Sequence, residues 1–306
     1  RGGGTAGAGG ANVHADSEAD ATDLSDFYRA WAWKREHLPD RDRFRRPYVH
    51  DLDEPPGGHV TLKQARFAAT GFASTVWDSS IVVAKYLQAN PQLVRNRRCL
   101  DLSAGCGLIA VVMARLGAKA VVATDLGDNL ALLRNNCEAN VPGCVQVVEH
   151  CWGTEVERLL PNFDVVVACD VMYISEAVHA LADTLCGTVA AGGQVLLAHG
   201  RNRGGEAEFF DTVRGRLDVQ HLPHRKLHPK FFCDDVLVFQ LTPSGQHGGQ
   251  RGMADSGHAA LPGTCGSQHA VQDSAEGCVQ ESKVSRDMPR QEVGSAGKRK
   301  VGGAAG

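Results

Sequence analysis

Residues 99–108 have the sequence CLDLSAGCGL, an apolar run followed by a turn of small residues and the start of an apolar helix. Small residues in such a turn let a ligand approach the backbone, and the start of the next helix offers unpaired main-chain N–H groups. A second apolar run ends at Asp125, eighteen residues after Gly107, where a carboxylate can accept hydrogen bonds from both ribose hydroxyls. Together these features predict a nucleoside-containing cofactor at the carboxyl edge of a sheet.

Short apolar runs alternate with helix-like segments from residue 98 to residue 241. This alternation is typical of a parallel sheet with helices on its faces, and runs such as VVVAC at 165–169 suit strands that are covered on both sides. The predicted fold class is α/β, a doubly wound and mostly parallel seven-stranded sheet. The predicted strands are Arg98–Leu102, Lys119–Thr124, Cys144–Glu149, Asp164–Cys169, Gln194–Ala198, Leu217–His221 and Val236–Leu241, and the predicted helices are Asp78–Ala89, Leu108–Leu116, Asn129–Ala139, Glu176–Val189 and Glu206–Arg216.

The two ends of the chain differ in composition from its middle. Residues 1–22 are mostly small or polar, and residues 243–306 contain no Phe, Trp, Tyr or Ile. Such segments bury too little apolar area to offset the entropy lost on ordering. We therefore predict disordered arms over 1–22 and 243–306 and one domain over 23–242. Within that domain, the aromatic and Arg-rich residues 27–62 predict a lid or a hairpin packed on the main sheet.

Composition excludes several classes of protein. The formal net charge of −3 argues against a dedicated nucleic-acid binder, and no apolar run reaches the roughly 20 residues that span a bilayer. Without a secretory signal, we expect a cytoplasmic protein, and the KRK sequence at 298–300 is compatible with nuclear import. The ten cysteines stand singly and the histidines lack paired ligand spacing, so we expect reduced thiols and no metal. The basic cluster at 41–46 is more typical of a solvated segment than of a site.

The glycine-rich turn alone does not choose the cofactor, because Gly105, Gly107 and Ala110 also fit the dinucleotide fingerprint. The fourth predicted strand is more informative. It ends in the sequence CDVMY at 169–173, which places Asp170 and Tyr173 at the ligand edge. A carboxylate and a phenol beside a cofactor suit an amine substrate better than a hydride acceptor.

The order and spacing of these segments resemble the seven-β-strand, S-adenosylmethionine-dependent methyltransferases, which are Rossmann-like. Within them the chain is most similar to the protein-lysine methyltransferase group called family 16 or methyltransferase-like 21. The resemblance covers about residues 60–243, and its last piece matches the D-x-x-Y signature of that group. Its pieces are TGF at 70–72, VWDS at 76–79, LDLSAGCGL at 100–108, LGA at 116–118, TD at 124–125, NN at 135–136 with Asn140, WG at 152–153 and DVMY at 170–173.

The resemblance implies methyl transfer from S-adenosyl-L-methionine to a lysine side chain of a protein. It places the turn at 103–105 around the methionine and ribose, Asp125 on the ribose hydroxyls and Trp152 beside the adenine. It implies a monomer acting on a chaperone, an ATPase or an elongation factor, and the composition adds the expectation of no stable nucleic-acid partner and no membrane. The implied cofactor-binding residues are Trp77, Ser103, Ala104, Gly105, Asp125, Trp152 and Cys169, and the implied catalytic residues, facing the lysine, are Asp170 and Tyr173.

Two residues depart from the pattern of that group, which usually has Glu at the place of Asp101 and Gly at the place of Ser103. The first change shortens the reach of a carboxylate, and the second adds a side chain that weakens cofactor binding if it intrudes.

Other interpretations stay open from the residues alone. A methyltransferase acting on a small molecule or another side chain, an NAD(P)-dependent oxidoreductase and a non-catalytic binding module would share most of these features. Trp77 and Trp152 also suit a structural core, Asp125 could cap the helix predicted near Asp128, and Asp170 could be a turn former.

Overall fold

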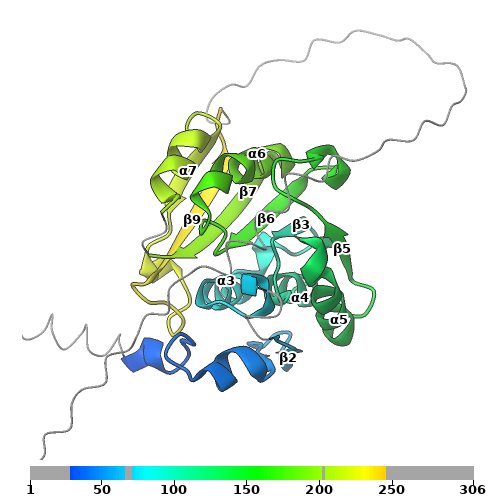
Figure 1. The fold of residues 1–306 in the computed structure, drawn as a ribbon, viewed down its shortest axis with the longest axis vertical. Helices are drawn as coiled ribbons and strands as arrows, with labels where there is room; N and C mark the ends of the chain where they lie inside the picture. Colours follow the sequence, from blue (N-terminus) through cyan, green and yellow to red (C-terminus); the bar gives the residue numbers. More distant parts are fainter. Residues whose placement is uncertain (1–27, 66–70, 202–203, 246–306) are drawn as a thin grey trace, which may run out of the picture. The chain divides into compact units, whose positions relative to one another are not determined.

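The structure is a computed structural model that describes residues 28–245 except 66–70 and 202–203. Seven strands form one sheet in the order β5-β4-β3-β6-β7-β9-β8 (Figure 1). Strands β3 to β7 run parallel, and β9 is antiparallel to both of its neighbours. The strands are β1 Tyr48–Asp51, β2 His59–Leu62, β3 Arg98–Leu102, β4 Ala120–Asp125, β5 Val145–Glu149, β6 Phe163–Cys169, β7 Val189–Gly200, β8 Leu217–His221 and β9 Val236–Pro243.

The helices form a layer on each face of the sheet, as Figure 1 shows. The buried apolar residues of α3 and α4 belong to one hydrophobic cluster together with Leu133 and Cys137 of α5, and those of α6 and α7 belong to another. The α-helices are α3 Asp78–Ala89, α4 Leu108–Arg115, α5 Leu130–Asn140, α6 Val178–Thr188 and α7 Glu206–Val213. The short helical turns are η1 Arg41–Arg45, η2 Gly71–Ser74, η3 Pro91–Leu93, η4 Gly127–Asn129, η5 Val156–Leu159, η6 Ser175–Ala177 and η7 His224–Lys226.

The predicted doubly wound α/β fold is therefore confirmed, and the strand order turns back at β3. Since β4 and β6 lie on opposite sides of β3 and their following connections diverge, a crevice is expected at the carboxyl ends of these strands. The predicted end segments 1–22 and 243–306 lie outside the described residues except for 243–245, where Pro243 is the last residue of β9 and not part of a disordered arm. Among those that are described, no helix is both long and apolar enough to cross a bilayer.

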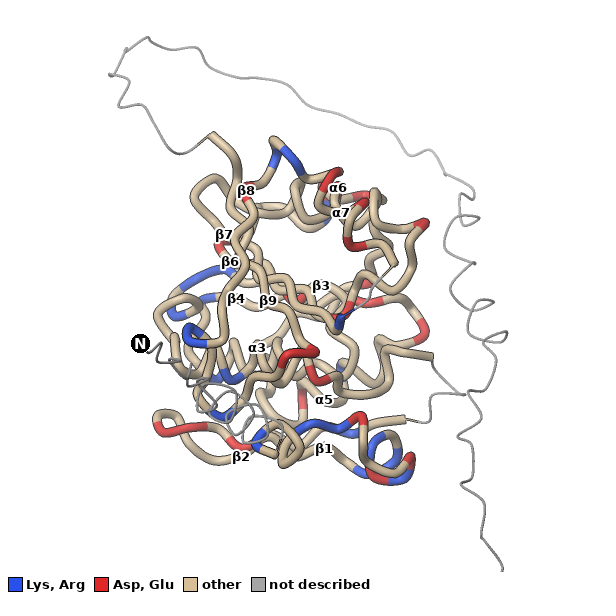
Figure 2. The backbone as a smooth tube through the Cα atoms, turned by 90° about the vertical axis from the view of Figure 1, so that its left-hand side faces the viewer, with Lys and Arg blue, Asp and Glu red and all other residues tan. Residues whose placement is uncertain are grey.

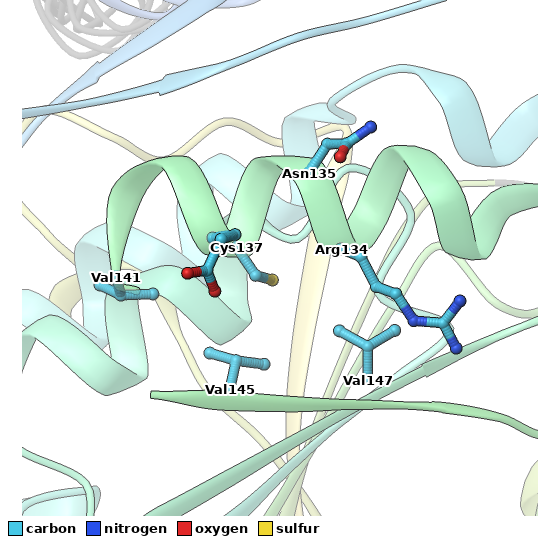
Figure 3. Close-up of a pocket in the computed structure, with 7 residues that line it drawn as sticks. Arg134, Asn135, Cys137, Val141, Val145 and Val147 are labelled. Carbon is cyan, nitrogen blue, oxygen red and sulfur yellow. The ribbon is translucent and has the colours of Figure 1, made fainter. Parts of the chain in front are cut away.

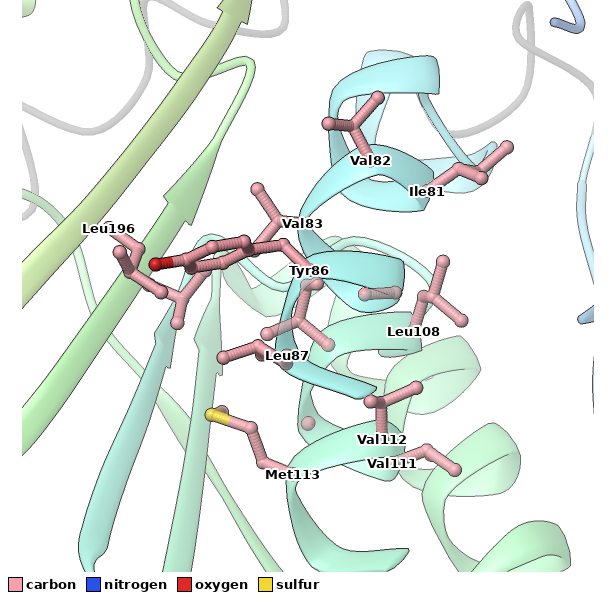
Figure 4. Close-up of a cluster of buried hydrophobic side chains, with 14 of the residues drawn as sticks. Ile81, Val82, Val83, Tyr86, Leu87, Leu108, Val111, Val112, Met113 and Leu196 are labelled. Atoms are coloured by element: carbon pink, nitrogen blue, oxygen red, sulfur yellow. The ribbon is translucent and has the colours of Figure 1, made fainter. Parts of the chain in front are cut away.

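The cluster beneath α3 and α4 fixes the position of the site because both helices begin at the ligand edge. Apolar side chains such as Leu87, Met113 and Leu196 are fully buried together there (Figure 4). Complete burial of side chains of this size contributes about 1.5–3 kcal/mol each relative to exposure. The first turns of α3 and α4 are thus held on the sheet by packing further along each helix.

The element boundaries differ most at β7, which the pattern predicted to begin at Gln194 and which begins at Val189. Its pairing with β6 shifts register after Phe163, so the residues around Gly193 bulge out of the ladder. A Cβ on Gly193 would lie 2.9 Å from the carbonyl oxygen of Asp164, too close to be tolerated. Glycine in a strand marks such a bulge, and here it also disguises the start of the strand.

A hairpin of β1 and β2 forms within residues 27–62, but its predicted packing on the main sheet is wrong. Figure 1 shows β2 beside the helices, and Leu62 is buried in their cluster. The side-chain amides of Asn136 and Asn140 on α5 each exchange two hydrogen bonds with the main chain of Lys63 and Thr61, at 2.8–3.0 Å. These amides hydrogen-bond the backbone groups of Thr61 in β2 and of Lys63 just after it, and so take the place of a further strand.

The basic cluster at 41–46 forms η1 and leads into β1, where Figure 2 shows basic and acidic residues side by side. Asp42 accepts contacts from Arg41 at 3.3 Å and from Arg46 at 2.9 Å. The side chains of both arginines are exposed, so the ion pairs contribute little to stability.

Candidate active site

The turn between β3 and α4 follows a backbone path that favours glycine. Ser103, Gly105 and Gly107 have φ angles of +59°, +56° and +85°, all in the left-handed region. A Cβ on Gly107 would lie 2.8 Å from the Leu133 side chain, and one on Gly105 would lie 3.0 Å from the carbonyl oxygen of Ala73. The small residues therefore allow close packing of the protein on this turn as well as close approach of a ligand.

Asp125 ends β4 and holds the turn in place. Its Oδ2 accepts a hydrogen bond from the Gly105 N–H at 2.7 Å, and its Oδ1 accepts one from the Leu126 N–H at 2.9 Å. Burial raises the pKa of this carboxyl, while the N–H donors and Asn129 oppose the rise. No side-chain cap is present at the start of α5, so Asp125 is not its cap. Because each carboxylate oxygen has two lone pairs, both can still accept a hydroxyl.

Asp101 has a role that the sequence did not reveal. Its Oδ2 accepts a hydrogen bond from the Ala110 N–H at 2.9 Å, so the side chain satisfies a donor in the first turn of α4. Burial raises the pKa of Asp101 to about 7; the Ala110 N–H lowers it, and the nearby Asp125 charge raises it. The sequence feature that could have indicated this role is a single carboxylate, Asp101, within the apolar strand that precedes a helix.

Ser103 and Trp152 are joined although they follow different strands. The indole Nε1 of Trp152 donates to the Ser103 Oγ at 3.0 Å, and the half-buried ring packs against the cluster beneath α6. The serine side chain therefore contacts the tryptophan that the resemblance places beside the adenine.

Asp170 follows β6 with a φ of +54° and directs its carboxylate to two donors. Its Oδ2 accepts from the Ser79 hydroxyl at 2.6 Å, and its Oδ1 accepts from the Gly200 N–H at 3.1 Å. Its own N–H donates to the carbonyl of Ala198 at 2.7 Å. These contacts join Asp170 to α3 and β7 and fix its carboxylate at the edge of the sheet.

Three aromatic rings lie in succession beside this carboxylate. The ring of Tyr173 is 5.3 Å from that of Phe72, which is 6.2 Å from that of Trp77. The Trp77 indole donates to the Phe72 carbonyl at 2.9 Å, and 40% of the Tyr173 surface is exposed. Tyr173 therefore presents a ring to solvent while Trp77 is tied to the loop before α3.

A cavity of about 200 Å³ brings Trp77 and Asp170 together. None of the other seven predicted site residues lines it; those at 103–105, 125 and 152 lie along the neighbouring ends of β3, β4 and β5. Its walls come from the N-terminal segment, the start of α3 and the ends of β6, β7 and β9. The lining residues are Lys34, Glu36, Arg43, Trp77, Asp78, Ser79, Asp170, Gly200, Asp235 and Val236.

The wall of this cavity contains a primary ammonium, that of Lys34. The Lys34 Nζ contacts Asp235 Oδ2 at 2.5 Å and also pairs with Glu36. Burial opposes its charge, but the hydrogen bonds to Asp235 and Glu36 outweigh that effect and raise the pKa of Lys34 above its usual range. The cavity is therefore an environment in which carboxylates stabilise a lysine ammonium.

A larger cavity of about 400 Å³ lies elsewhere, between α5 and the edge strand β5 (Figure 3). It is lined by residues such as Arg134, Cys137 and Val147 and by none of the predicted site residues. Although this cavity is larger, Asp170 does not line it, so we assign it no part in the chemistry at Asp170.

Comparisons with known proteins match this chain to methyltransferases. A family model described as lysine methyltransferase matches residues 58–216, a span that contains all nine predicted site residues. Protein N-lysine methyltransferase METTL21A of Mus musculus is 35% identical over 167 residues, which cover 52% of this chain and 76% of that protein. EEF1A lysine methyltransferase 3 of Mus musculus is 27% identical over 198 residues, covering 62% of this chain and 83% of that protein. Among solved structures, the T. thermophilus 16S rRNA N2 G1207 methyltransferase is similar at 20% identity and a TM-score of 0.48, covering 65% of this chain and 50% of that one.

Proposed function

This chain belongs to the lysine methyltransferase family, and from that premise we propose that it transfers a methyl group from S-adenosylmethionine to a lysine of another protein. The observation that carries the proposal is the cavity lined by Asp170 and Trp77. In its wall, Asp235 binds the ammonium of the chain's own Lys34. A hydride acceptor would gain nothing from such a lining. An amine acceptor would be held and oriented by it.

The residues at the ends of β3, β4 and β5 fit a nucleoside. Two buried polar atoms beside Asp125, the Asn129 Oδ1 and the His150 Nε2, have no partner among the described residues. Asn129 donates to the Gly105 carbonyl at 2.8 Å, and the His150 N–H donates to the Asp125 carbonyl at 3.1 Å. Both residues are therefore bound to the two residues, Gly105 and Asp125, that are themselves joined by a hydrogen bond. Buried polar atoms normally have partners, and polar groups of a bound nucleoside would supply them here.

In this proposal Asp125 accepts the ribose hydroxyls, and the backbone at 103–105 and at Cys169 follows the methionine portion. Trp152 covers the adenine, and Trp77 separates the cofactor from the acceptor cavity. When bound, S-adenosylmethionine supplies an already activated methyl group. The protein therefore needs no nucleophile of its own, and its contribution is to align the acceptor nitrogen and exclude water, which is worth several powers of ten in rate.

We propose that two residues act on the acceptor: Asp170, which lines the cavity, and Tyr173, whose partly exposed ring lies outside that lining. A lysine ammonium with an ordinary pKa of about 10.4 must lose a proton before it attacks, and a partly dry site lowers that pKa. Asp170 accepts a hydrogen bond from the amine and orients its lone pair. The Tyr173 ring packs on the cationic or methylated nitrogen, an interaction of about 0.5–2 kcal/mol. The proton leaves through water, so neither residue is assigned as an obligatory base.

The substrate is a protein, as the names of both curated relatives state for those proteins. We assign it to the chaperones, ATPases or elongation factors, and the enzyme to the cytoplasm, with the basic sequence at 298–300 allowing nuclear entry. A monomer that needs neither nucleic acid nor membrane completes the proposal.

The decisive experiment incubates the purified chain with S-adenosylmethionine carrying a labelled methyl group and a cell extract, and identifies the labelled protein and residue.

Asp125→Ala should weaken binding of S-adenosylhomocysteine by at least tenfold, because the carboxylate that accepts the ribose hydroxyls is removed. Asp170→Ala should keep that binding and lose transfer. Full turnover in both variants, or binding of NAD in place of S-adenosylhomocysteine, would contradict the assignment.

A further inference from the structure

Ser103 holds a backbone conformation that serine seldom adopts. Its φ of +59° places it in the left-handed region, where glycine carries no steric penalty and a Cβ does. Its N–H donates a long hydrogen bond to the Thr124 Oγ1 at 3.4 Å. Strain of this kind persists only where the surrounding structure maintains it, and it concentrates at functional sites. What the side chain gains in return is the hydrogen bond from Trp152.

The backbone next to Trp152 is anchored on the opposite side. The Gly153 N–H donates to the Thr184 Oγ1 of α6 at 2.8 Å, and a Cβ on Gly153 would lie 3.0 Å from that of Ala180. The main chain is thus seated on α6, while the indole N–H reaches 3.0 Å to the Ser103 hydroxyl. With the backbone fixed, a tryptophan has two side-chain torsions left, and a hydrogen bond at the ring edge restricts both.

The Ser103 hydroxyl also sets the position of the ring relative to the ribose carboxylate. Ser103 precedes Gly105 by two residues, and the Gly105 N–H is bound to Asp125 at 2.7 Å. The turn that carries the hydroxyl is therefore the turn that Asp125 fixes. Ring, turn and carboxylate form one connected unit before any cofactor arrives.

We propose that Ser103 is a positioning residue for the cofactor, whose hydroxyl holds the Trp152 indole in the orientation that packs on the adenine. This inference rests on the proposed function, since it assumes a cofactor between Asp125 and Trp152. A half-buried ring that is already oriented loses less freedom when a ligand binds, so the hydroxyl improves affinity by pre-organisation. The extra side chain at position 103 therefore strengthens binding, which reverses the expectation from the sequence.

The test measures the dissociation constant of S-adenosylhomocysteine by calorimetry for the full chain and its variants. Ser103→Ala should weaken binding about five- to tenfold, as expected for one lost hydrogen bond that orients a ring. The change should appear in the KM for S-adenosylmethionine and much less in kcat. In a Trp152→Phe background, where no indole N–H exists, Ser103→Ala should change the dissociation constant less than twofold.

Two further variants separate positioning from fold stability. Ser103→Gly should weaken binding as Ser103→Ala does, yet unfold at a higher temperature than Ser103→Ala because glycine relieves the strained φ. Ser244→Ala, which removes another hydrogen-bonded serine at the opposite edge of the sheet, should bind as the wild type does. If Ser103→Ala bound S-adenosylhomocysteine with unchanged affinity, or lost equal affinity in the wild-type and Trp152→Phe backgrounds, the positioning role of Ser103 would be wrong. The proposed function would still stand. Failure of the wild type to bind S-adenosylhomocysteine would overturn the proposed function and this inference together.

Discussion

Asp101 is a fully buried carboxylate whose charge the fold stabilises poorly. Its pKa of about 7 lies above the value near 3.9 expected in an unfolded chain. Between these values the native state keeps a proton that the unfolded state releases, so this residue makes stability fall as pH rises from about 4 to about 7. Asp101→Asn keeps an oxygen for the Ala110 N–H and removes the titration. The unfolding free energy of Asp101→Asn relative to wild type should therefore rise over that range, by up to a few kcal/mol.

Urea unfolding at half-unit pH steps checks this prediction. The comparison near pH 3 is an internal control, since Asp101 is then mostly protonated in both states. The difference should stop growing once the pH exceeds about 7. A difference that does not depend on pH would show that Asp101 is ionised without penalty in the folded protein.

The predicted site residues differ in how well the sequence could define them. Asp125 and Asp170 follow strands whose ends are evident from apolar runs, so their place at the ligand edge could be predicted. The contact of Ser103 with Trp152 could not be, because 49 residues separate them and the pairing depends on how the turn at Gly153 sits on α6. The role of Asp101 could not be predicted either, since a strand pattern does not show which donor the carboxylate binds.

At the level of elements, α3 is tied to the β1–β2 hairpin by one buried cation. The Nζ of Lys85 donates to the Asp51 carbonyl at 2.7 Å, to the Asp53 carboxylate at 2.9 Å and to Gln88 at 3.3 Å. Its ammonium also lies 4.9 Å from the centre of the Phe231 ring. Lys85→Met should lower the unfolding free energy by about 1–3 kcal/mol, because the Asp51 carbonyl loses its partner.

Thermal or urea unfolding measures that loss, and limited proteolysis within residues 48–62 should reveal a loosened hairpin. Lys119→Met is the matched control because Lys119 is exposed, and it should change stability by less than about 0.5 kcal/mol. Equal stability of the two variants would mean that Lys85 does not hold the hairpin.

The main sheet was predictable at this scale, and so was a hairpin within residues 27–62, but the placement of that hairpin was not. Runs such as Val165–Val167 are apolar on both faces because helices cover both, and that composition alone indicates a strand. The hairpin instead depends on Asn136 and Asn140, whose amides look in the sequence like ordinary polar positions of a helix. The placement of the hairpin depends on contacts between residues far apart in sequence, and the local hydrophobic periodicity does not predict such contacts.

At the scale of the whole molecule, the acceptor cavity joins the two ends of the described chain. Lys34 and Asp235 are 201 positions apart in sequence and share a hydrogen bond in its wall. In the proposed function, a charge placed there acts on the amine held by Asp170, because Lys34, Asp235 and Asp170 line the same cavity. In the proposed function, the N-terminal segment therefore affects the acceptor amine through the charge of Lys34, and the same segment packs on the core through the buried Ala30.

Lys34→Met should therefore shift the pH dependence of methyl transfer toward alkaline pH. The Lys34 ammonium lowers the pKa of an incoming ammonium by like-charge repulsion, and its removal frees Asp235 and Glu36 to raise that pKa. The neutral amine then becomes available only at higher pH, and the kcat profile should move by about 0.5 to 1 pH unit. Lys34→Arg, which restores a cation, should return the profile toward wild type, whereas a profile that is identical in all three proteins would place the acceptor amine outside this cavity.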